Sequence, residues 1–240
     1  MLNQVGESLY GRKEKPSVAG IIINVVLVIF TLVLVWEVVF NTLYTGIYVI
    51  NISMTPTLHG ATISGYNADG TPIADIDGDY VYIRNGAKPD YGDVVVIYWA
   101  DRKENIIKRA VAFGGDELWF KEGWLYLKRK GEDKAEKQEE PYISDQYRTD
   151  YSHPEYYNFY SEDNPYTVKE GCVFALGDNR NHSDDSRGYG DFPLKNVLGV
   201  VPKWSIKNKS ISTAWHKFFY FTLRGKKTAE IPAENPLYTA

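Results

Sequence analysis

The sequence has little cysteine and no surplus of positive charge. Its single cysteine, Cys172, excludes an intrachain disulfide and a zinc site built from paired cysteines. With 27 Lys and Arg against 31 Asp and Glu, the net charge is −4, so the chain lacks the basic field on which nucleic-acid binding depends. We expect no nucleic-acid partner, no metal site and no cofactor.

Charge is also missing from one stretch near the N-terminus. The 240 residues are 44% hydrophobic, which excludes disordered and fibrous classes and allows one good-sized domain or two small ones. Residues 18–36 are uncharged, and at ~1.5 Å per helical residue they reach about 28 Å, close to the ~30 Å core of a bilayer. A secretory signal peptide has a shorter apolar region and a small-x-small cleavage site, which does not follow here, and a buried helix would show polar periodicity. We predict an uncleaved transmembrane anchor over residues 18–40.

Lysine and arginine are absent from residue 16 to residue 83, whereas Arg12, Lys13 and Lys15 precede the apolar stretch. The positive-inside rule counts such residues near the ends of a span. We therefore predict that residues 1–17 are cytoplasmic and that the chain crosses the cytoplasmic (inner) membrane once. The rest of the chain is expected on the outer, periplasmic side.

The part beyond the anchor has the pattern of a β-rich domain. Six short segments are rich in β-branched and aromatic residues and are bounded by turn residues such as Asn85-Gly86. They are residues 79–84, 93–99, 105–113, 117–120, 124–128 and 172–176. Because no long amphipathic helix intervenes before about residue 210, a parallel sheet is disfavoured. We predict a mainly β fold, a complex antiparallel sheet with an inserted subdomain, preceded by one transmembrane helix.

The inserted subdomain is predicted from a change of composition. A charge run begins at residue 128, and seven tyrosines follow between residues 141 and 166. The predicted segments after the anchor are a β core of residues 41–127 and 171–205, an insertion of residues 128–170, and a C-terminal tail of residues 206–240. Within the tail, residues 211–224 have apolar residues near helical spacing. This helix can pack on the domain or lie at the membrane interface, and both interpretations remain open.

Two residues have the chemistry of nucleophilic catalysis. Ser53 stands in Asn51-Ile-Ser-Met-Thr-Pro, shortly after the predicted span; such a serine alone is usually a turn residue. Lys108 follows in a predicted strand, where alternation places it on the other side from Arg109. A strand lysine usually snorkels to water, but a buried one has a lowered pKa and can take the proton of a serine hydroxyl.

The predicted face of Lys108 is apolar. Alternation along the strand groups Lys108 with Ile106, Ala110 and Ala112. An apolar face favours the buried lysine that a general base requires.

A dense polar loop, residues 177–190, follows the last predicted strand. An EF-hand calcium loop needs oxygen ligands at alternate positions and glycine at the sixth. Starting from Asp178, the third, fifth and sixth positions are Arg180, His182 and Ser183, so calcium is disfavoured. An Asp and an Arg two residues apart in a tight loop can instead form a salt bridge that fixes the shape of the loop.

Four motifs, in this order, resemble the sequence blocks of type I signal peptidases, the bacterial leader peptidases with a Ser/Lys dyad. They are Ser53-Met-x-Pro-Thr-Leu, Gly92-Asp-Val-Val-Val, Lys108-Arg109 leading to Gly115-Asp116, and Gly177-Asp-Asn-Arg-x-x-Ser183-x-Asp185-Ser-Arg187-x-x-Gly190. The resemblance covers the anchor and residues 50–120 and 171–200, and it implies the fold of that family.

The resemblance also implies a role for each matching residue. Ser53 corresponds to the nucleophile, Lys108 to the general base, Ser183 to a serine whose hydroxyl hydrogen-bonds and orients the lysine, Asp185 and Arg187 to a salt-bridged pair, and Asp178 to the same polar network. The backbone N–H of Ser53 would serve the oxyanion hole. Asn51 stands where some members have a hydroxyl donor, and its amide can donate to an oxyanion.

The implied function is that of a membrane-anchored serine endopeptidase. It removes N-terminal signal peptides from exported precursors after small residues, of the Ala-x-Ala type. The expected partners are precursors that carry signal peptides and the lipid bilayer, and a monomer is expected. The alternatives are a specialised maturation peptidase for one secretion or conjugation substrate, and a catalytically inactive, membrane-tethered binding module. A classical Ser-His-Asp triad is disfavoured, although His59 lies near Ser53 in sequence.

Overall fold

The structure, a computed structural model, describes residues 17–66, 72–74, 77–148, 160–219 and 229–230. Several features predicted from the sequence lie outside the described residues: the basic residues Arg12, Lys13 and Lys15, residues 149–159 of the insertion, and residues 220–224 of the C-terminal helix. The chain divides into two compact units, Met1–Leu43 and Tyr44–Ala240.

The described part of the first unit contains one helix, α2 (Val18–Leu43), of 26 residues. Glu37 is its only charged residue, and none of its side chains is buried within the unit. At ~1.5 Å per residue it is about 39 Å long, enough to cross the hydrocarbon core of a bilayer. By length and composition, α2 is a candidate membrane-spanning helix.

The second unit is built mainly of antiparallel sheets, as predicted. The six segments predicted from composition correspond to β4 (Tyr80–Asn85), β5 (Val94–Trp99), β6 (Glu104–Phe113), β7 (Glu117–Lys121), β8 (Trp124–Lys128) and β11 (Cys172–Leu176). The strands that were not predicted are β1 (Tyr44–Tyr48), β2 (Ile63–Tyr66), β3 (Pro72–Ala74), β9 (Glu136–Lys137), β10 (Tyr166–Thr167), β12 (Phe192–Pro193), β13 (Val197–Val201) and β14 (Ala229–Glu230).

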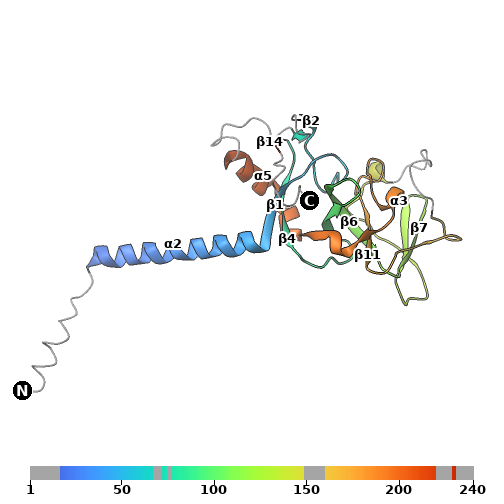
Figure 1. Ribbon diagram of the computed structural model, residues 1–240, viewed down its shortest axis with the longest axis horizontal. Coiled ribbons are helices and arrows are strands. Elements are labelled where there is room, and N and C mark those ends of the chain that lie inside the picture. The colour runs from blue at the N-terminus through green and yellow to red at the C-terminus, as the bar shows by residue number, and fades with distance from the viewer. Residues whose placement is uncertain (1–16, 67–71, 75–76, 149–159, 220–228, 231–240) are drawn as a thin grey trace, which may run out of the picture. The chain divides into compact units, whose positions relative to one another are not determined.

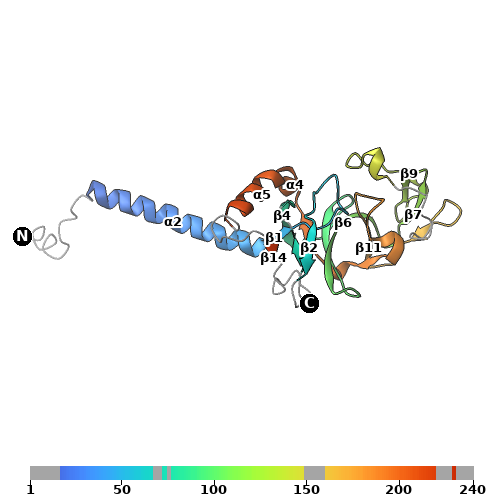
Figure 2. The same cartoon turned by 90° about the horizontal axis from the view of Figure 1, so that it is seen from above.

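The strands form three sheets in the described part of the chain. A seven-stranded sheet has the order β1-β4-β13-β5-β6-β11-β12, a four-stranded sheet the order β10-β7-β8-β9, and a three-stranded sheet the order β14-β3-β2. In both views β7 lies beyond β6 and β11, on the side away from β1 and β4 (Figures 1 and 2). The four-stranded sheet contains strands from both sides of residue 128. The boundary of the insertion at that residue therefore stays a prediction.

A β-bulge corrects one detail of the predicted strand at 105–113. Phe174 pairs with Ala112 and Ala175 with Ala110, so Val111 is an extra residue in β6. Ala110 packs in a cluster with Val95 and Val173 of neighbouring strands, whereas Ala112 packs with Val111 in a different cluster. The prediction that Ala112 continues the face of Lys108 is therefore wrong, because the bulge interrupts the alternation.

The helices that the structure describes in the second unit are short. They are the 3₁₀ helices η1 (Asp145–Tyr147) and η3 (Leu194–Asn196) and the α-helices α3 (Ser186–Tyr189), α4 (Lys203–Lys207) and α5 (Lys209–Lys217). Hydroxyl groups attach α4 and α5 to β4: the N–H of Tyr80 donates to Thr213 Oγ1 at 2.7 Å, and the N–H of Tyr82 donates to Ser205 Oγ at 2.7 Å. The C-terminal helix thus packs on the domain through its polar side.

Candidate active site

Ser53 lies in a tightly held turn between β1 and β2. The residue two positions earlier, Asn51, has a left-handed backbone with φ of 63° and donates its N–H to Ala61 O at 3.0 Å. Gly60 permits this close approach, since a Cβ there would lie 1.7 Å from Asn51 O. The side chain of Met54 is fully buried and anchors the turn in the core. These contacts fix the backbone on both sides of the serine.

The structure brings Lys108 and Ser53 together. Lys108 lies in β6 directly opposite Val95 of β5, and only 4% of it is exposed. Its Nζ is 3.0 Å from Ser53 Oγ and donates to Ile107 O at 2.9 Å. The amine is thus within hydrogen-bonding distance of the hydroxyl that it is predicted to deprotonate.

Burial changes the protonation of Lys108. Removal from water disfavours the ammonium and lowers the pKa from 10.5 to about 8, although the charges of Asp185, Asp184 and Glu104 oppose this shift. With such a pKa about a tenth of the amine is neutral at pH 7. A lysine that is partly neutral near physiological pH can act as a general base.

The polar loop that begins at residue 177 lies against the backbone of Ser53. Asn179 donates its N–H to Ser53 O at 3.0 Å, and its side-chain amide donates to Ile52 O at 3.3 Å. Gly177 allows this contact, because a Cβ there would lie 2.5 Å from Ser53 O. The loop therefore supports the nucleophile from the side of its carbonyl group.

The predicted salt bridge between Asp185 and Arg187 is present and fully buried. Arg187 Nε donates to Asp185 Oδ1 and its Nη2 to Oδ2, both at 2.9 Å. Asp185 also accepts from the N–H of Gly177 at 3.0 Å and caps the N-terminus of α3. Burial alone would raise the pKa of this carboxyl, but Arg187 and the backbone N–H groups outweigh it and lower the pKa.

Asp178 forms a second buried ion pair, with Arg109. Arg109 Nε donates to Asp178 Oδ1 at 2.7 Å and Nη2 to Oδ2 at 2.5 Å, while Nη1 donates to Gly92 O at 2.6 Å. The pair holds the polar loop to the strand that carries Lys108. Arg109 was not predicted as a site residue. The sequence feature that could have indicated it is its place next to Lys108, on the opposite side of β6.

Ser183 does not make the predicted hydrogen bond to Lys108. Its hydroxyl is buried and has no hydrogen-bond partner among the described residues. The hydroxyl instead lies against Gly177, 2.2 Å from where a Cβ would be, while the N–H groups of Lys108 donate to Ser53 and Ile107. The side chain of Asn51 is exposed, and its contribution to an oxyanion hole stays a prediction.

The contacts of the described histidines are with residues other than Ser53. His59 Nε2 lies 3.9 Å from Asp77 Oδ2, and both side chains are largely exposed. His216 stacks on Tyr80 at 3.9 Å between ring centroids, and His182 is exposed; His153 lies outside the described residues. No group of His, Cys, Asp and Glu that could hold a metal ion occurs in the described ranges.

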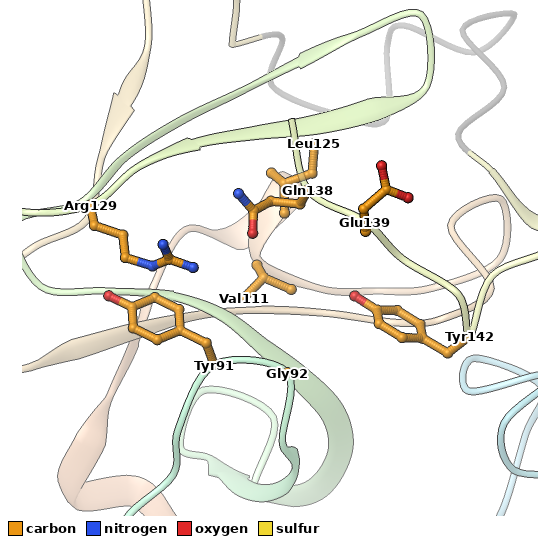
Figure 3. Close-up of a pocket in the computed structure, with 8 residues that line it drawn as sticks. All are labelled: Tyr91, Gly92, Val111, Leu125, Arg129, Gln138, Glu139 and Tyr142. Atoms are coloured by element: carbon orange, nitrogen blue, oxygen red, sulfur yellow. The ribbon is translucent and has the colours of Figure 1, made fainter. Parts of the chain in front are cut away.

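A pocket of about 220 Å³ lies between the seven-stranded sheet and the four-stranded sheet (Figure 3). It is lined by Tyr91, Gly92, Val111, Leu125, Arg129, Gln138, Glu139 and Tyr142. Neither Ser53 nor Lys108 contributes to its walls. Its importance for the site is that Tyr142 lies at one end, on the segment that approaches the polar loop.

Comparison with known proteins identifies the family. The sequence profile of the family described as "Signal peptidase, peptidase S26" matches residues 22–204. The chain belongs to this family. Membership makes it a peptidase whose expected substrates are precursor proteins that carry signal peptides.

Three relatives in sequence agree with the family. A signal peptidase I from Bacillus caldolyticus is 27% identical over 157 residues, which cover 62% of this chain and 83% of the relative. A signal peptidase I from Bacillus licheniformis is 30% identical over 151 residues, covering 62% and 69% of the two chains. A third, from Bacillus amyloliquefaciens, is 27% identical over 189 residues, covering 78% and 90%. A solved signal peptidase I from Enterococcus faecalis aligns at 26% identity over 48% of this chain and 98% of its own, with a TM-score of 0.38.

Proposed function

We propose that the chain is a membrane-anchored serine endopeptidase that removes N-terminal signal peptides after small residues, with Ser53 as nucleophile and Lys108 as general base. The observation that carries this proposal is the 3.0 Å separation of Lys108 Nζ and Ser53 Oγ. The pKa of about 8 for the buried amine supports it, because a neutral amine is the form that accepts a proton. Family membership supports the choice of substrate.

Acylation follows from this geometry. Ser53 Oγ attacks the carbonyl carbon of the scissile peptide bond while its proton passes to the neutral Lys108 amine. The resulting tetrahedral intermediate carries a negative oxygen, toward which the N–H of Ser53 can donate, since it has no acceptor among the described residues. When the C–N bond breaks, the Lys108 ammonium returns its proton to the leaving amine, and the signal peptide remains as an ester on Ser53.

Deacylation uses the same two groups. A water molecule attacks the ester carbonyl while Lys108, neutral again, takes a proton from the water. Collapse of the second tetrahedral intermediate breaks the C–Oγ bond, and the proton passes from the ammonium to Ser53 Oγ. The signal peptide leaves as a carboxylic acid, which loses its proton to the solvent, and the enzyme returns to its starting protonation.

We further propose that α2 anchors the enzyme in the cytoplasmic membrane, with the N-terminus inside and the β domain on the outer face. Confining the enzyme and the apolar segment of the precursor to one bilayer raises their effective concentration. The exposed side of α5 supports a membrane location: Ile211 is 71% and Trp215 is 63% exposed. Residues 203–219 include four lysines and no acidic residue, which suits anionic headgroups.

The contact of α5 with lipid can be measured in the full chain. With Cys172 replaced by serine, nitroxide labels at Ile211→Cys and Phe218→Cys in bilayers containing anionic lipid should be more accessible to oxygen than to a water-soluble nickel complex, because apolar labels at the interface enter the acyl boundary. A label at the exposed Asp133→Cys, in the β8–β9 connection, serves as the control in water. Labels at 211 and 218 with the aqueous accessibility of the control would show that α5 does not touch the membrane.

Incubation with precursor proteins also tests the two alternative functions. A specialised maturation peptidase would cut one secretion or conjugation substrate and leave a generic precursor intact. An inactive binding module would bind precursors without cutting them, although the retention of both Ser53 and Lys108 in contact disfavours this function.

The decisive assay incubates the full-length protein in detergent with a precursor that contains an Ala-x-Ala site, followed by N-terminal sequencing of the product. Cleavage directly after the second alanine is expected. Replacing the alanine at the first or third position before the cut by leucine should lower kcat/KM at least about tenfold by size exclusion. An intact precursor, or equal cleavage of the leucine variants, would contradict the proposed specificity.

A further inference from the structure

Two charged residues that are distant in sequence are buried against each other outside the dyad. Glu140 belongs to the predicted insertion and Arg180 to the polar loop, and only 2% and 1% of these residues are exposed. The guanidinium binds the carboxylate with both terminal nitrogens, Nη2 to Oε1 and Nη1 to Oε2, the second at 3.5 Å. Tyr142 OH donates to Glu140 Oε1 at 3.0 Å, and Arg148 Nη1 lies 3.7 Å from Oε2. The carboxylate is thus surrounded by donors.

Arg180 links this carboxylate to the loop under the nucleophile. Its Nε donates to Gly177 O at 3.1 Å while the two terminal nitrogens remain on Glu140. A guanidinium is planar. Because two of its nitrogens bind Glu140, the direction of the third N–H group, which points to Gly177, is fixed. Asn179, between these residues, donates its N–H to Ser53 O at 3.0 Å.

The backbone of the same segment also holds the loop. Arg180 donates its N–H to Tyr147 O at 2.9 Å, and the side-chain amide of Asn181 donates to Gln146 O at 3.1 Å. In its described part, the insertion contacts residues 177–181 through the buried ion pair and these hydrogen bonds. This short turn is thus held both by Ser53 and by the insertion.

A second contact leads from the insertion toward Lys108. The ring of Tyr142 lies 3.7 Å from Arg109 Cζ, a cation–π contact. Arg109 follows Lys108 in β6 and is paired with Asp178 of the loop. Tyr142, which also donates to Glu140, therefore ties the ion pair to the residue next to the base.

We propose that Glu140 is a positioning residue for the peptidase reaction, acting through Arg180 on the Gly177 carbonyl and thereby on the backbone of Ser53. The inference rests on the proposed function of Ser53 and Lys108. It assigns a role to the segment around residue 140: the segment sets the position of the nucleophile relative to the base. Glu140 itself touches neither of them.

The effect on rate follows from geometry. Displacement of a nucleophile by about 1 Å from its productive position can cost ~10²-fold in rate. Glu140→Gln keeps the shape of the side chain but removes the charge that orients Arg180. Arg180→Lys keeps the charge but cannot bind the carboxylate with two nitrogens and Gly177 O with a third. We expect both variants to lower kcat about 10- to 100-fold, with KM changed less than threefold.

The experiment measures kcat and KM for precursor cleavage by the full chain in detergent, together with the melting temperature. Glu139→Gln is the matched control, because Glu139 is the exposed neighbour at the rim of the pocket (Figure 3). The double variant Glu140→Gln/Arg180→Lys should be no slower than the slower single variant, since the two residues act as one unit. Wild-type protein and Ser53→Ala run beside them.

The outcomes separate this inference from the proposed function. If the wild type does not cut the precursor, the proposed function fails. If the wild type cuts and folded Glu140→Gln and Arg180→Lys cut with wild-type kcat, the positioning role is overturned. A loss confined to KM would assign the pair to substrate binding instead, and failure of both variants to fold would make it a determinant of folding, so either result also overturns the proposal.

Discussion

Replacing Lys108 by methionine should lower kcat for precursor cleavage by at least about 10³-fold, because the base that takes the proton of Ser53 is removed. Only 4% of Lys108 is exposed. Methionine has nearly the same length and is apolar, so it fits this buried position and introduces no charge. Ser53→Ala should cause a loss of the same order. The double variant should be no slower than either single one, since the two groups act in the same steps.

The measurement is kcat from initial rates with the precursor, beside a melting curve for each variant. Lys121→Met is a suitable control, because Lys121 is an exposed strand lysine with a solvent-exposed ion pair to Glu162. It should leave kcat unchanged. A Lys108→Met protein that retains more than a tenth of the wild-type kcat would remove lysine from the mechanism.

Replacing Asp185 by asparagine should destabilise the domain by about 3–5 kcal/mol, because Arg187 would remain buried without a counter-charge. The amide can keep one acceptor for the N–H of Gly177 but cannot bind both guanidinium nitrogens of Arg187. For a domain of this size each kcal/mol shifts the melting temperature by roughly 2–4 °C, so a fall of roughly 6–20 °C is expected.

The contribution of Asp185 should depend on pH in a defined direction. Its pKa is lowered in the folded state, so the stabilisation is present above the unfolded pKa of about 3.9 and is lost as the pH falls through the lower, folded value. The difference in melting temperature between wild type and Asp185→Asn should therefore be full near pH 7 and shrink below about pH 4.

The control for this prediction is Asp184→Asn. The side chain of Asp184 is 61% exposed in its ion pair with Arg102, and such pairs contribute little to stability. Melting curves of both variants at pH 7 and at low pH give the comparison. An Asp185→Asn protein as stable as Asp184→Asn would show that the buried pair does not hold the loop.

The sequence predicted the strands best where alternation and composition agree. Residues 94–99 and 104–113 form two neighbouring strands inside the seven-stranded sheet. Lys108 was correctly assigned to the second of these strands, which places it beside Ser53. The prediction was less complete for β1 and β13, whose identity as strands depends on pairing with β4 rather than on a strong local pattern. The bulge at Val111 likewise depends on the partner strand β11.

The polar contacts of the site were predictable only at short range. Spacing allows an Asp and an Arg two residues apart to pair, and the family resemblance singled out Asp185 and Arg187, whose salt bridge is present. Arg109 and Asp178 are 69 residues apart, and Glu140 and Arg180 are 40 apart, so no local pattern connects them. Ser183 was expected to bond Lys108 from family resemblance, but its hydroxyl lies against Gly177.

The pH dependence of kcat/KM for precursor cleavage tests the Ser53–Lys108 mechanism most directly. Because only the neutral amine accepts a proton, the rate should rise tenfold per pH unit at low pH, pass a single ionisation near the Lys108 pKa of about 8 and level off above it. A rate controlled by an ionisation near 6.5, typical of histidine, or independent of pH between 6 and 9, would contradict the mechanism.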